Sequence, residues 1–242
     1  MTKPKAPLAK KLPHRLEKHG DVRIDNYYWM NDRENPAVIA YLEEENAYYH
    51  QMTSHTKDFQ DRLFMEMKGR IKEDDESVPY KQNGFWYMTR FETGQQYPVY
   101  SRKRESLDAQ EEIMFNCNAM AQGHDFFNLG GISVSPNNEM AAFAIDTVSR
   151  RQYTLQIKNL KTGEIYRDKI ENTSGGAVWA EDNKTIFYTQ KNPVTLRSDK
   201  IFKHVLGTTS DQDELVYHEK DETFGTYVYR TKSKKFIIIS SY

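Results

Sequence analysis

Few residues of this chain have the type and the spacing that chemistry requires. Its seven histidines are scattered, and on an expected helix His50 and His55 stand five positions apart, not the three or four that bring two imidazoles onto one helical face. The string nearest to a nucleophile elbow, Gly131 to Ser135, lacks the second glycine of G-x-S-x-G. Phosphate-loop and dinucleotide motifs are absent. We therefore expect no metal, no cofactor and no catalytic residue in these 242 residues.

Cys117 is the single cysteine of the chain. It could act as a nucleophile, but no residue near it in the sequence would serve as its base. The expected role is therefore a buried side chain that behaves as a small apolar group. A single cysteine also excludes an intramolecular disulfide, which agrees with a reducing compartment or with a secreted protein that needs no disulfide.

The remaining polar feature is the segment from Ser149 to Tyr153, in which Arg150 and Arg151 are adjacent at an expected turn between two strands. Two neighbouring arginines can simply be hydrated at the surface. Alternatively, they can pair with carboxylates of another domain, because the planar guanidinium suits bidentate contacts.

The elements around this turn form a repeat. The segment 131–174 reads as four short strands in roughly 45 residues, the size of a propeller blade. The pattern recurs from Gly176 and begins again at Tyr227. Each unit has an apolar face that it cannot bury alone, so successive sheets are expected to stack. The four strands are an apolar pair at Ile132 and Val134, the run from Met140 to Ile145, Tyr153 to Leu160, and a short strand at Ile165 and Tyr166.

An earlier unit contains Asn83 and Gly84 between two aromatic-rich runs, a strong signal for a β-hairpin. We predict that residues 76–242 form the first blades of a propeller, about three to three and a half in number. The predicted blades cover about 78–130, 131–175 and 176–225, and a fourth begins at about 226–242.

Residues 1–75 are expected to form an N-terminal arm and a helical clasp, which makes the fold all-β with N-terminal helices. The first 20 or so residues are rich in proline and lysine and lack periodicity, which predicts an extended arm. One helix is expected to begin at Pro36, where the missing N–H of proline costs nothing, and a second to run from Thr56 to Lys68. Apolar residues at helical spacing are Val38, Ile39, Leu42 and Ala47 in the first helix and Phe59, Leu63, Phe64 and Met67 in the second.

Composition narrows the class of protein. The net charge is -1 with both signs well mixed, so binding to nucleic acid or to an anionic membrane is not expected. No apolar leader segment and no long apolar run occur, so we expect the protein to be located in the cytoplasm, with the periplasm as the alternative.

The chain ends directly after the apolar run Phe236 to Ile239, which would leave an unpaired sheet edge. We therefore expect it to be the N-terminal part of a longer protein.

Five segments together resemble the N-terminal part of the prolyl oligopeptidase family of serine peptidases, and its oligopeptidase B branch in particular. The likeness runs along nearly the whole chain, in order and at compatible spacing. The segments are His19 to Met30 (HGDVRIDNYYWM), Tyr41 to Asn46 (YLEEEN), Tyr97 to Arg102 (YPVYSR), Ser149 to Tyr153 (SRRQY) and Asn159 to Glu164 (NLKTGE).

The resemblance implies a seven-bladed propeller carried between an N-terminal segment and a C-terminal α/β-hydrolase domain. In that family the catalytic Ser, Asp and His, the oxyanion hole and the acidic pocket that selects Arg or Lys lie in the hydrolase domain, which is absent from this chain. No catalytic residue can be carried over, and the chain alone is expected to be inactive. The propeller would gate access of short peptides.

By the same resemblance, Arg150 and Arg151 are candidates for a contact with the chain's own C-terminal hydrolase domain. The alternative hypothesis is a stand-alone propeller that serves as a binding scaffold without catalytic activity.

Overall fold

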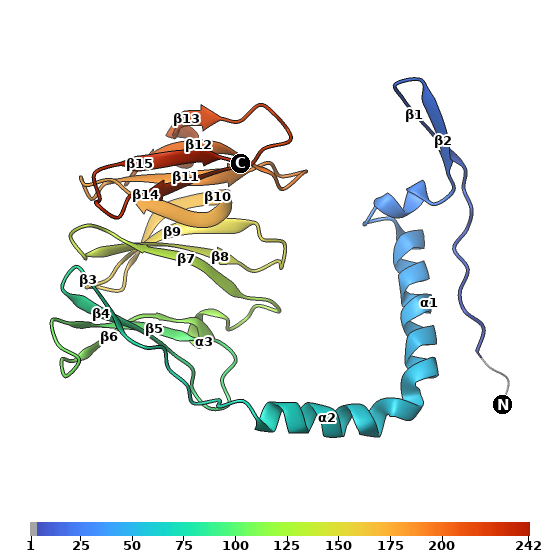
Figure 1. The fold of residues 1–242 in the computed structure, drawn as a ribbon, viewed down its shortest axis with the longest axis horizontal. Helices are drawn as coiled ribbons and strands as arrows, with labels where there is room; N and C mark the ends of the chain where they lie inside the picture. Colours follow the sequence, from blue (N-terminus) through green and yellow to red (C-terminus); the bar gives the residue numbers. More distant parts are fainter. Residues whose placement is uncertain (1–3) are drawn as a thin grey trace. The chain divides into compact units, whose positions relative to one another are not determined.

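The computed structural model describes residues 4–242, which form two compact units. The first unit extends to Lys72, and the second runs from Glu73 to Tyr242. The first contains a hairpin and two helices, and the second consists almost entirely of antiparallel strands (Figure 1). The predicted fold class, all-β with N-terminal helices and a partial β-propeller, is confirmed.

The first unit begins with a hairpin that the sequence analysis did not predict. Strands β1 (His14–Lys18) and β2 (Asp21–Asp25) pair antiparallel across a turn of two residues. His19 and Gly20 both have positive φ, 56° and 81°, as the tight turns that match the twist of a hairpin require. The short helix η1 (Tyr28–Asn31) follows.

Two helices complete the first unit. Helix α1 (Pro36–Thr53) begins at the predicted residue, because the Asn35 side chain accepts the Ala37 N–H at 3.0 Å and Pro36 occupies the first helical position. The short helix η2 (Ser54–Thr56) leads into α2 (Lys57–Gly69). In the described part of the chain, no helix is long and apolar enough to cross a membrane.

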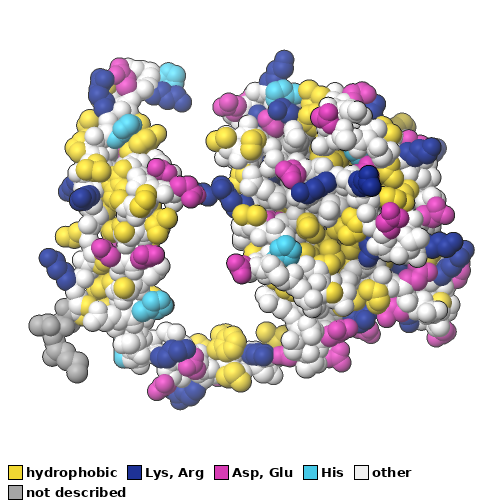
Figure 2. Space-filling model, turned by 180° about the vertical axis from the view of Figure 1, so that it is seen from behind, with side chains coloured by type: hydrophobic (Ala, Val, Ile, Leu, Met, Phe, Trp, Pro, Cys, Tyr) yellow, Lys and Arg dark blue, Asp and Glu magenta, His cyan; other side chains and the backbone are white. Residues whose placement is uncertain are grey.

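The expected apolar face of these helices is mostly exposed. Of the eight residues predicted at helical spacing, Val38 is buried, whereas Phe59 and Phe64 are 57% and 59% exposed. We call helices α1 and α2 the helical arm. Hydrophobic side chains are visible along the whole of it (Figure 2). The first unit therefore has little core of its own.

The second unit begins with a four-stranded antiparallel sheet in sequential order. Asn83 and Gly84, with φ of 48° and 81°, form the predicted turn between its first two strands. The small helix α3 (Cys117–Met120) follows the sheet. The strands are β3 (Tyr80–Gln82), β4 (Phe85–Arg90), β5 (Val99–Arg104) and β6 (Glu111–Asn116).

A seven-stranded antiparallel sheet follows, also in sequential order. A two-stranded sheet of β14 (Thr226–Arg230) and β15 (Ile237–Ser241) ends the chain, and a short helix, η3 (Ser210–Gln212), precedes β13. The seven strands are β7 (Asn128–Val134), β8 (Met140–Asp146), β9 (Tyr153–Asn159), β10 (Ile165–Trp179), β11 (Thr185–Lys191), β12 (Ser198–Val205) and β13 (Glu214–His218).

Strand β10 joins what the sequence predicts as two separate units. Up to Thr173 it pairs with β9, and from Ala177 to Trp179 it pairs with β11. The prediction of a short strand at Ile165 and Tyr166 was wrong in extent. The strand continues because register shifts on both sides of Thr173 let it bend, and Gly175 adopts φ 97° at the bend.

Strands from successive repeat units lie side by side, with β7 beside β10 and β10 beside β14. The turn after each of these strands, and the turn after β3, contains one residue other than glycine with left-handed backbone. Asparagine tolerates this conformation better than most residues. The four residues are Asn83, Asn138, Asn183 and Lys234, with φ of 48°, 63°, 58° and 62°. The sheets do not close into a ring, and the blade and domain limits given above stay a prediction.

The core lies between successive sheets. One cluster, including Phe85, Phe115 and Phe143, joins the four-stranded sheet to β7 and β8. A second joins β8 and β9 to β10 and β11 around Trp179, whose indole N–H donates to the carbonyl oxygen of Ser133 at 2.7 Å. Successive groups of strands thus bury each other's apolar faces, as expected for repeated units.

Candidate functional site

Arg150 and Arg151 lie in the turn between β8 and β9, where the sequence analysis expected them. The backbone of this turn is unusual, because Ser149 and Arg151 both adopt left-handed φ, 64° and 54°. Residues other than glycine rarely adopt this conformation. The turn therefore needs compensating contacts.

Asp146, the last residue of β8, supplies these contacts. Its carboxylate is 2% exposed and accepts three backbone N–H groups of the turn. Oδ1 accepts from Val148 at 2.8 Å and from Ser149 at 3.1 Å, and Oδ2 accepts from Arg151 at 2.6 Å. Hydrogen bonds to an ionised acceptor are stronger than neutral ones. A buried carboxylate thus holds the arginine-bearing turn in one shape.

The two guanidinium groups are exposed and have no hydrogen-bond or ion-pair partner among residues 4–242. Lys191 on β11 donates from Nζ to the carbonyl oxygen of Arg151 at 2.8 Å. Burial lowers the pKa of the Lys191 ammonium, and the nearby Arg151 lowers it further. This end of the sheet therefore presents positive charge to solvent, and it is able to pair with carboxylates.

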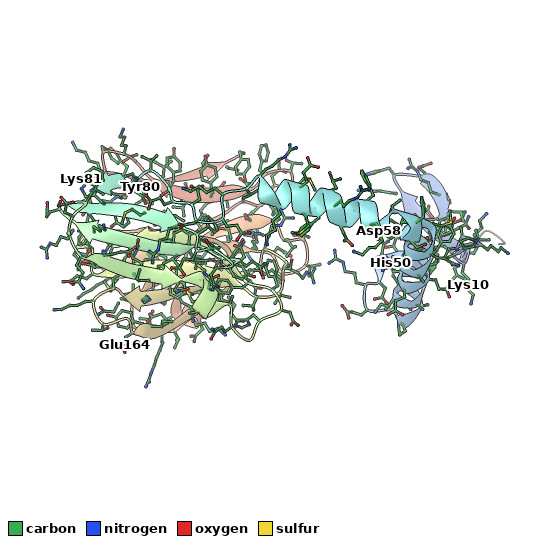
Figure 3. All side chains as sticks on the ribbon, turned by 90° about the horizontal axis from the view of Figure 1, so that it is seen from below. Lys10, His50, Asp58, Tyr80, Lys81 and Glu164 are labelled. Atoms are coloured by element: carbon green, nitrogen blue, oxygen red, sulfur yellow. The ribbon has the colours of Figure 1, made fainter. Side chains whose placement is uncertain are left out.

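A second polar feature lies at the opposite end of the strands, where β3, β7, β10 and β14 end. We name it the inner-strand pocket. It has a volume of about 560 Å³ and is lined by the ends of β3, β7, β10 and β14 and by the turn 231–234. Lys81, the middle residue of β3, lines this pocket and is labelled beside Tyr80 in Figure 3. The sequence analysis missed this pocket because its lining comes from four separate segments.

A smaller pocket, of about 320 Å³, lies between β3, β4 and β7. Three tyrosines line it, and burial raises the pKa of Tyr80, Tyr87 and Tyr100. These phenols are therefore neutral at physiological pH and can donate hydrogen bonds or pack, but they cannot act as bases.

His204 has two carboxylate neighbours but is a structural residue. Its Nδ1 lies 2.6 Å from Asp213 and its Nε2 lies 2.9 Å from Asp168, and its side chain is 1% exposed. The hydroxyl of Tyr188 donates to Asp213 at 2.7 Å, and burial raises the pKa of that phenol. This closed network, which the sequence analysis did not detect, offers no access to a substrate.

The structure gives no other candidate nucleophile or metal centre among the residues that it describes. Within residues 4–242, no group of three or more His, Cys, Asp or Glu side chains could hold a metal ion. Cys117 is 1% exposed, and burial raises the pKa of its thiol to about 11. A neutral buried thiol is a poor nucleophile, and the predicted role as a small buried side chain is confirmed.

Comparison with protein families gives one match over almost the whole chain. The family model described as "Prolyl oligopeptidase, N-terminal beta-propeller domain" matches residues 7–242.

Two curated relatives match along the chain. Dipeptidyl aminopeptidase BI of Pseudoxanthomonas mexicana is 42% identical over 252 aligned positions, which cover 97% of this chain and 35% of the relative. Protease 2 of Moraxella lacunata is 34% identical over 244 positions, which cover 98% of this chain and 35% of the relative. The chain thus spans about a third of the length of these relatives.

Solved structures agree with this match. Oligopeptidase B from Leishmania major superposes with a TM-score of 0.91 at 29% identity, over 98% of this chain and 36% of that one. Oligopeptidase B from Trypanosoma brucei with covalently bound antipain, in a closed form, gives a TM-score of 0.89 at 26% identity and the same coverage.

Proposed function

Because this chain belongs to the prolyl oligopeptidase family, as its N-terminal β-propeller domain, we propose that it is the propeller part of an oligopeptidase B-like serine endopeptidase. The observation that carries the proposal is the superposition on oligopeptidase B along 98% of the chain. The proposed substrates are short peptides, cleaved after Arg or Lys.

In this proposal the chemistry takes place in a C-terminal α/β-hydrolase domain. The relatives are about three times as long as the matched region, which leaves room for such a domain. Its serine would attack the peptide carbonyl with the help of a histidine, form an acyl-enzyme and release it to water. The thiol of Cys117 is buried and is therefore not a candidate for this chemistry.

The proposed role of the propeller is to restrict access by size. A cavity enclosed between two domains cannot receive a folded protein, whereas a short peptide can enter. Selection by size would then come from the geometry of the propeller, and selection for Arg or Lys from acidic groups in the hydrolase domain.

Arg150 and Arg151 are proposed to contact carboxylates of the hydrolase domain. Their exposure and the rigid turn that Asp146 maintains support this role. The double variant Arg150→Glu/Arg151→Glu should lower kcat/KM of the complete gene product several-fold and increase its radius of gyration in solution scattering, because like charges would then face each other. Lys220→Glu, an exposed lysine outside the turn, is the matched control. Unchanged kinetics and radius in the double variant would reject the contact.

The helical arm is proposed to pack its apolar face on another part of the complete protein. Phe59, Leu63 and Met67, which share one face of α2, are 57%, 39% and 52% exposed. Contiguous exposed apolar side chains of this kind are typical of an interaction surface.

A second candidate function follows from the relative at 42% identity, which is named a dipeptidyl aminopeptidase. Such an enzyme would need a free substrate amino terminus, whereas the proposed endopeptidase would not.

The two candidates are separated by assaying the complete gene product with two reporter peptides. One has a blocked amino terminus and Arg before the scissile bond, and the other is a free dipeptide linked to the same reporter group. Cleavage of the blocked peptide, with a folded Lys-rich protein left intact, is the expected result. Cleavage of the free dipeptide alone would favour the second candidate. If a folded sample cleaved neither, a binding scaffold without activity would remain.

A further inference from the structure

The lining of the inner-strand pocket combines positively charged and apolar side chains. Four cationic side chains line it, against one carboxylate: Lys81, Arg230, Lys232, Lys234 and Glu181. The chain as a whole carries a net charge of only -1, so this local excess of positive charge does not reflect its composition. The partly exposed side chains of Val134, Pro136, Ala177 and Val178 supply the apolar part of the lining.

The single carboxylate is already engaged. Glu181 forms an ion pair with Arg230, whose guanidinium also donates to the carbonyl oxygen of Lys234 at 2.8 Å. The ammonium group of Lys234 donates to the side-chain oxygen of Asn83. These contacts connect the end of β14 and the turn that follows it with the turn after β10 and with the turn after β3.

Two cations remain available. Lys81 and Lys232 are exposed and form no ion pair with any residue from 4 to 242. The ammonium of Lys81 lies 5.6 Å from the centroid of the Trp86 ring, which leaves its donors free. Lys81 lies on β3 in the four-stranded sheet and Lys232 in the turn between β14 and β15, yet they line one pocket. An anion there would meet two ammonium groups that form no ion pair with the described residues, and because both groups are exposed, the attraction should depend on ionic strength.

We propose that the inner-strand pocket binds a carboxylate group of a peptide, with Lys81 and Lys232 as its partners. The volume of about 560 Å³ fits one or two peptide side chains but not a folded partner. The apolar walls suit the aliphatic part of a Glu side chain or of a C-terminal residue. Only the choice of a peptide as the ligand rests on the proposed function.

The test measures binding to the complete gene product by fluorescence anisotropy at low ionic strength. The probe is a labelled Gly-Glu peptide that lacks Arg and Lys, so it is not a substrate of the proposed peptidase. The double variant Lys81→Glu/Lys232→Glu should raise the Kd about tenfold or more, because it replaces two attractions with two repulsions. Lys220→Glu, at the opposite end of the strands, should leave the Kd unchanged.

Two further peptides identify the source of the carboxylate. An amidated Gly-Glu peptide retains only side-chain carboxylates, and a Glu-free peptide with a free C-terminus retains only the terminal one. Pocket-dependent binding of either supports the proposal and assigns the group. The milder variant Lys81→Gln/Lys232→Gln should give an intermediate Kd. It provides the test if the Lys81→Glu/Lys232→Glu variant does not fold.

Three outcomes would overturn the proposal. They are no binding of any probe, equal Kd values for the wild type and the double reversal, and equal weakening by Lys220→Glu, which would indicate general charge attraction only. Peptide binding is measured independently of peptide cleavage. The pocket can therefore be supported even if the reporter assays fail, and it can be rejected even if they succeed.

Discussion

The buried Oδ2 atom of Asp146 accepts the backbone N–H of Arg151 at 2.6 Å. A carboxylate at the end of a sheet strand thereby holds an exposed cationic turn whose left-handed residues would otherwise be strained. The chemical character of the turn comes from the arginines, but its shape comes from the aspartate.

Replacement of Asp146 by Asn should destabilise this turn. The amide retains one acceptor oxygen but loses the charge and the second acceptor, so the free energy of unfolding should fall by about 1–3 kcal/mol. Hydrogen exchange of the Arg151 amide should become faster. Glu164→Gln, at an exposed turn, removes a carboxylate without such contacts and is the control. Unchanged amide exchange at Arg151 in the Asn variant would contradict the assignment.

The glycine at position 131 is required by a close backbone approach. A Cβ there would lie 2.6 Å from the carbonyl oxygen of Gly175 on β10, a distance that the backbone cannot accept without shifting. Gly131→Ala should therefore lower the free energy of unfolding by about 1–3 kcal/mol. Gly176→Ala, whose Cβ would meet nothing within 4 Å, should have little effect. Thermal or denaturant unfolding of the two variants decides the point, and equal stability would contradict the close approach.

Arg102 connects two sheets through contacts that lysine cannot reproduce. It is 4% exposed, donates from Nη1 to the carbonyl oxygen of Asn138 at 2.8 Å and from Nε to Glu112 at 2.8 Å, and lies over the Phe85 ring at 4.1 Å. Arg102→Lys should cost about 2–4 kcal/mol of unfolding free energy, since one ammonium cannot serve both acceptors. Arg104→Lys, at an exposed position on the same strand, should be nearly neutral. Similar losses in both variants would show that Arg102 holds no special contacts.

The stability of the protein should respond to pH through Cys117. Burial raises the pKa of its thiol from 9.0 to about 11, so the folded state retains a proton that the unfolded state releases first. This stabilising contribution is complete below pH 9 and declines as the pH rises toward 11. The unfolding free energy of Cys117→Ala should decline less steeply over that window. Parallel slopes for wild type and variant would contradict the raised pKa.

Local chemistry allowed several elements to be predicted from the sequence. The hairpin at Asn83 and Gly84 and the start of α1 at Pro36 depend on residues close to each other in the chain, and both were correct. The hairpin around His19 was missed because its strands are short and rich in charged residues. The alternation of Val22 and Ile24 with charged residues in β2 and the Gly20 turn were local signals that the sequence analysis did not use.

Other features depend on contacts between distant residues. The extent of β10 is set by strands that pair with its two halves on opposite edges, and Gly175 with Gly176 reads as a break when those partners are unknown. The inner-strand pocket unites Lys81 with Lys232, and no local pattern connects two lysines that are about 150 positions apart. Arg150 and Arg151 were found because they are adjacent, whereas their support by Asp146 became visible only in the fold.

The central proposal is that this propeller chain is the non-catalytic part of a serine peptidase. Its most direct test is to label the complete gene product with a serine-directed fluorophosphonate and to locate the modified residue by peptide mass spectrometry. The account predicts one labelled serine outside residues 1–242, with loss of reporter cleavage in proportion to labelling. A labelled serine within residues 1–242, or an active enzyme that resists the reagent, would contradict it.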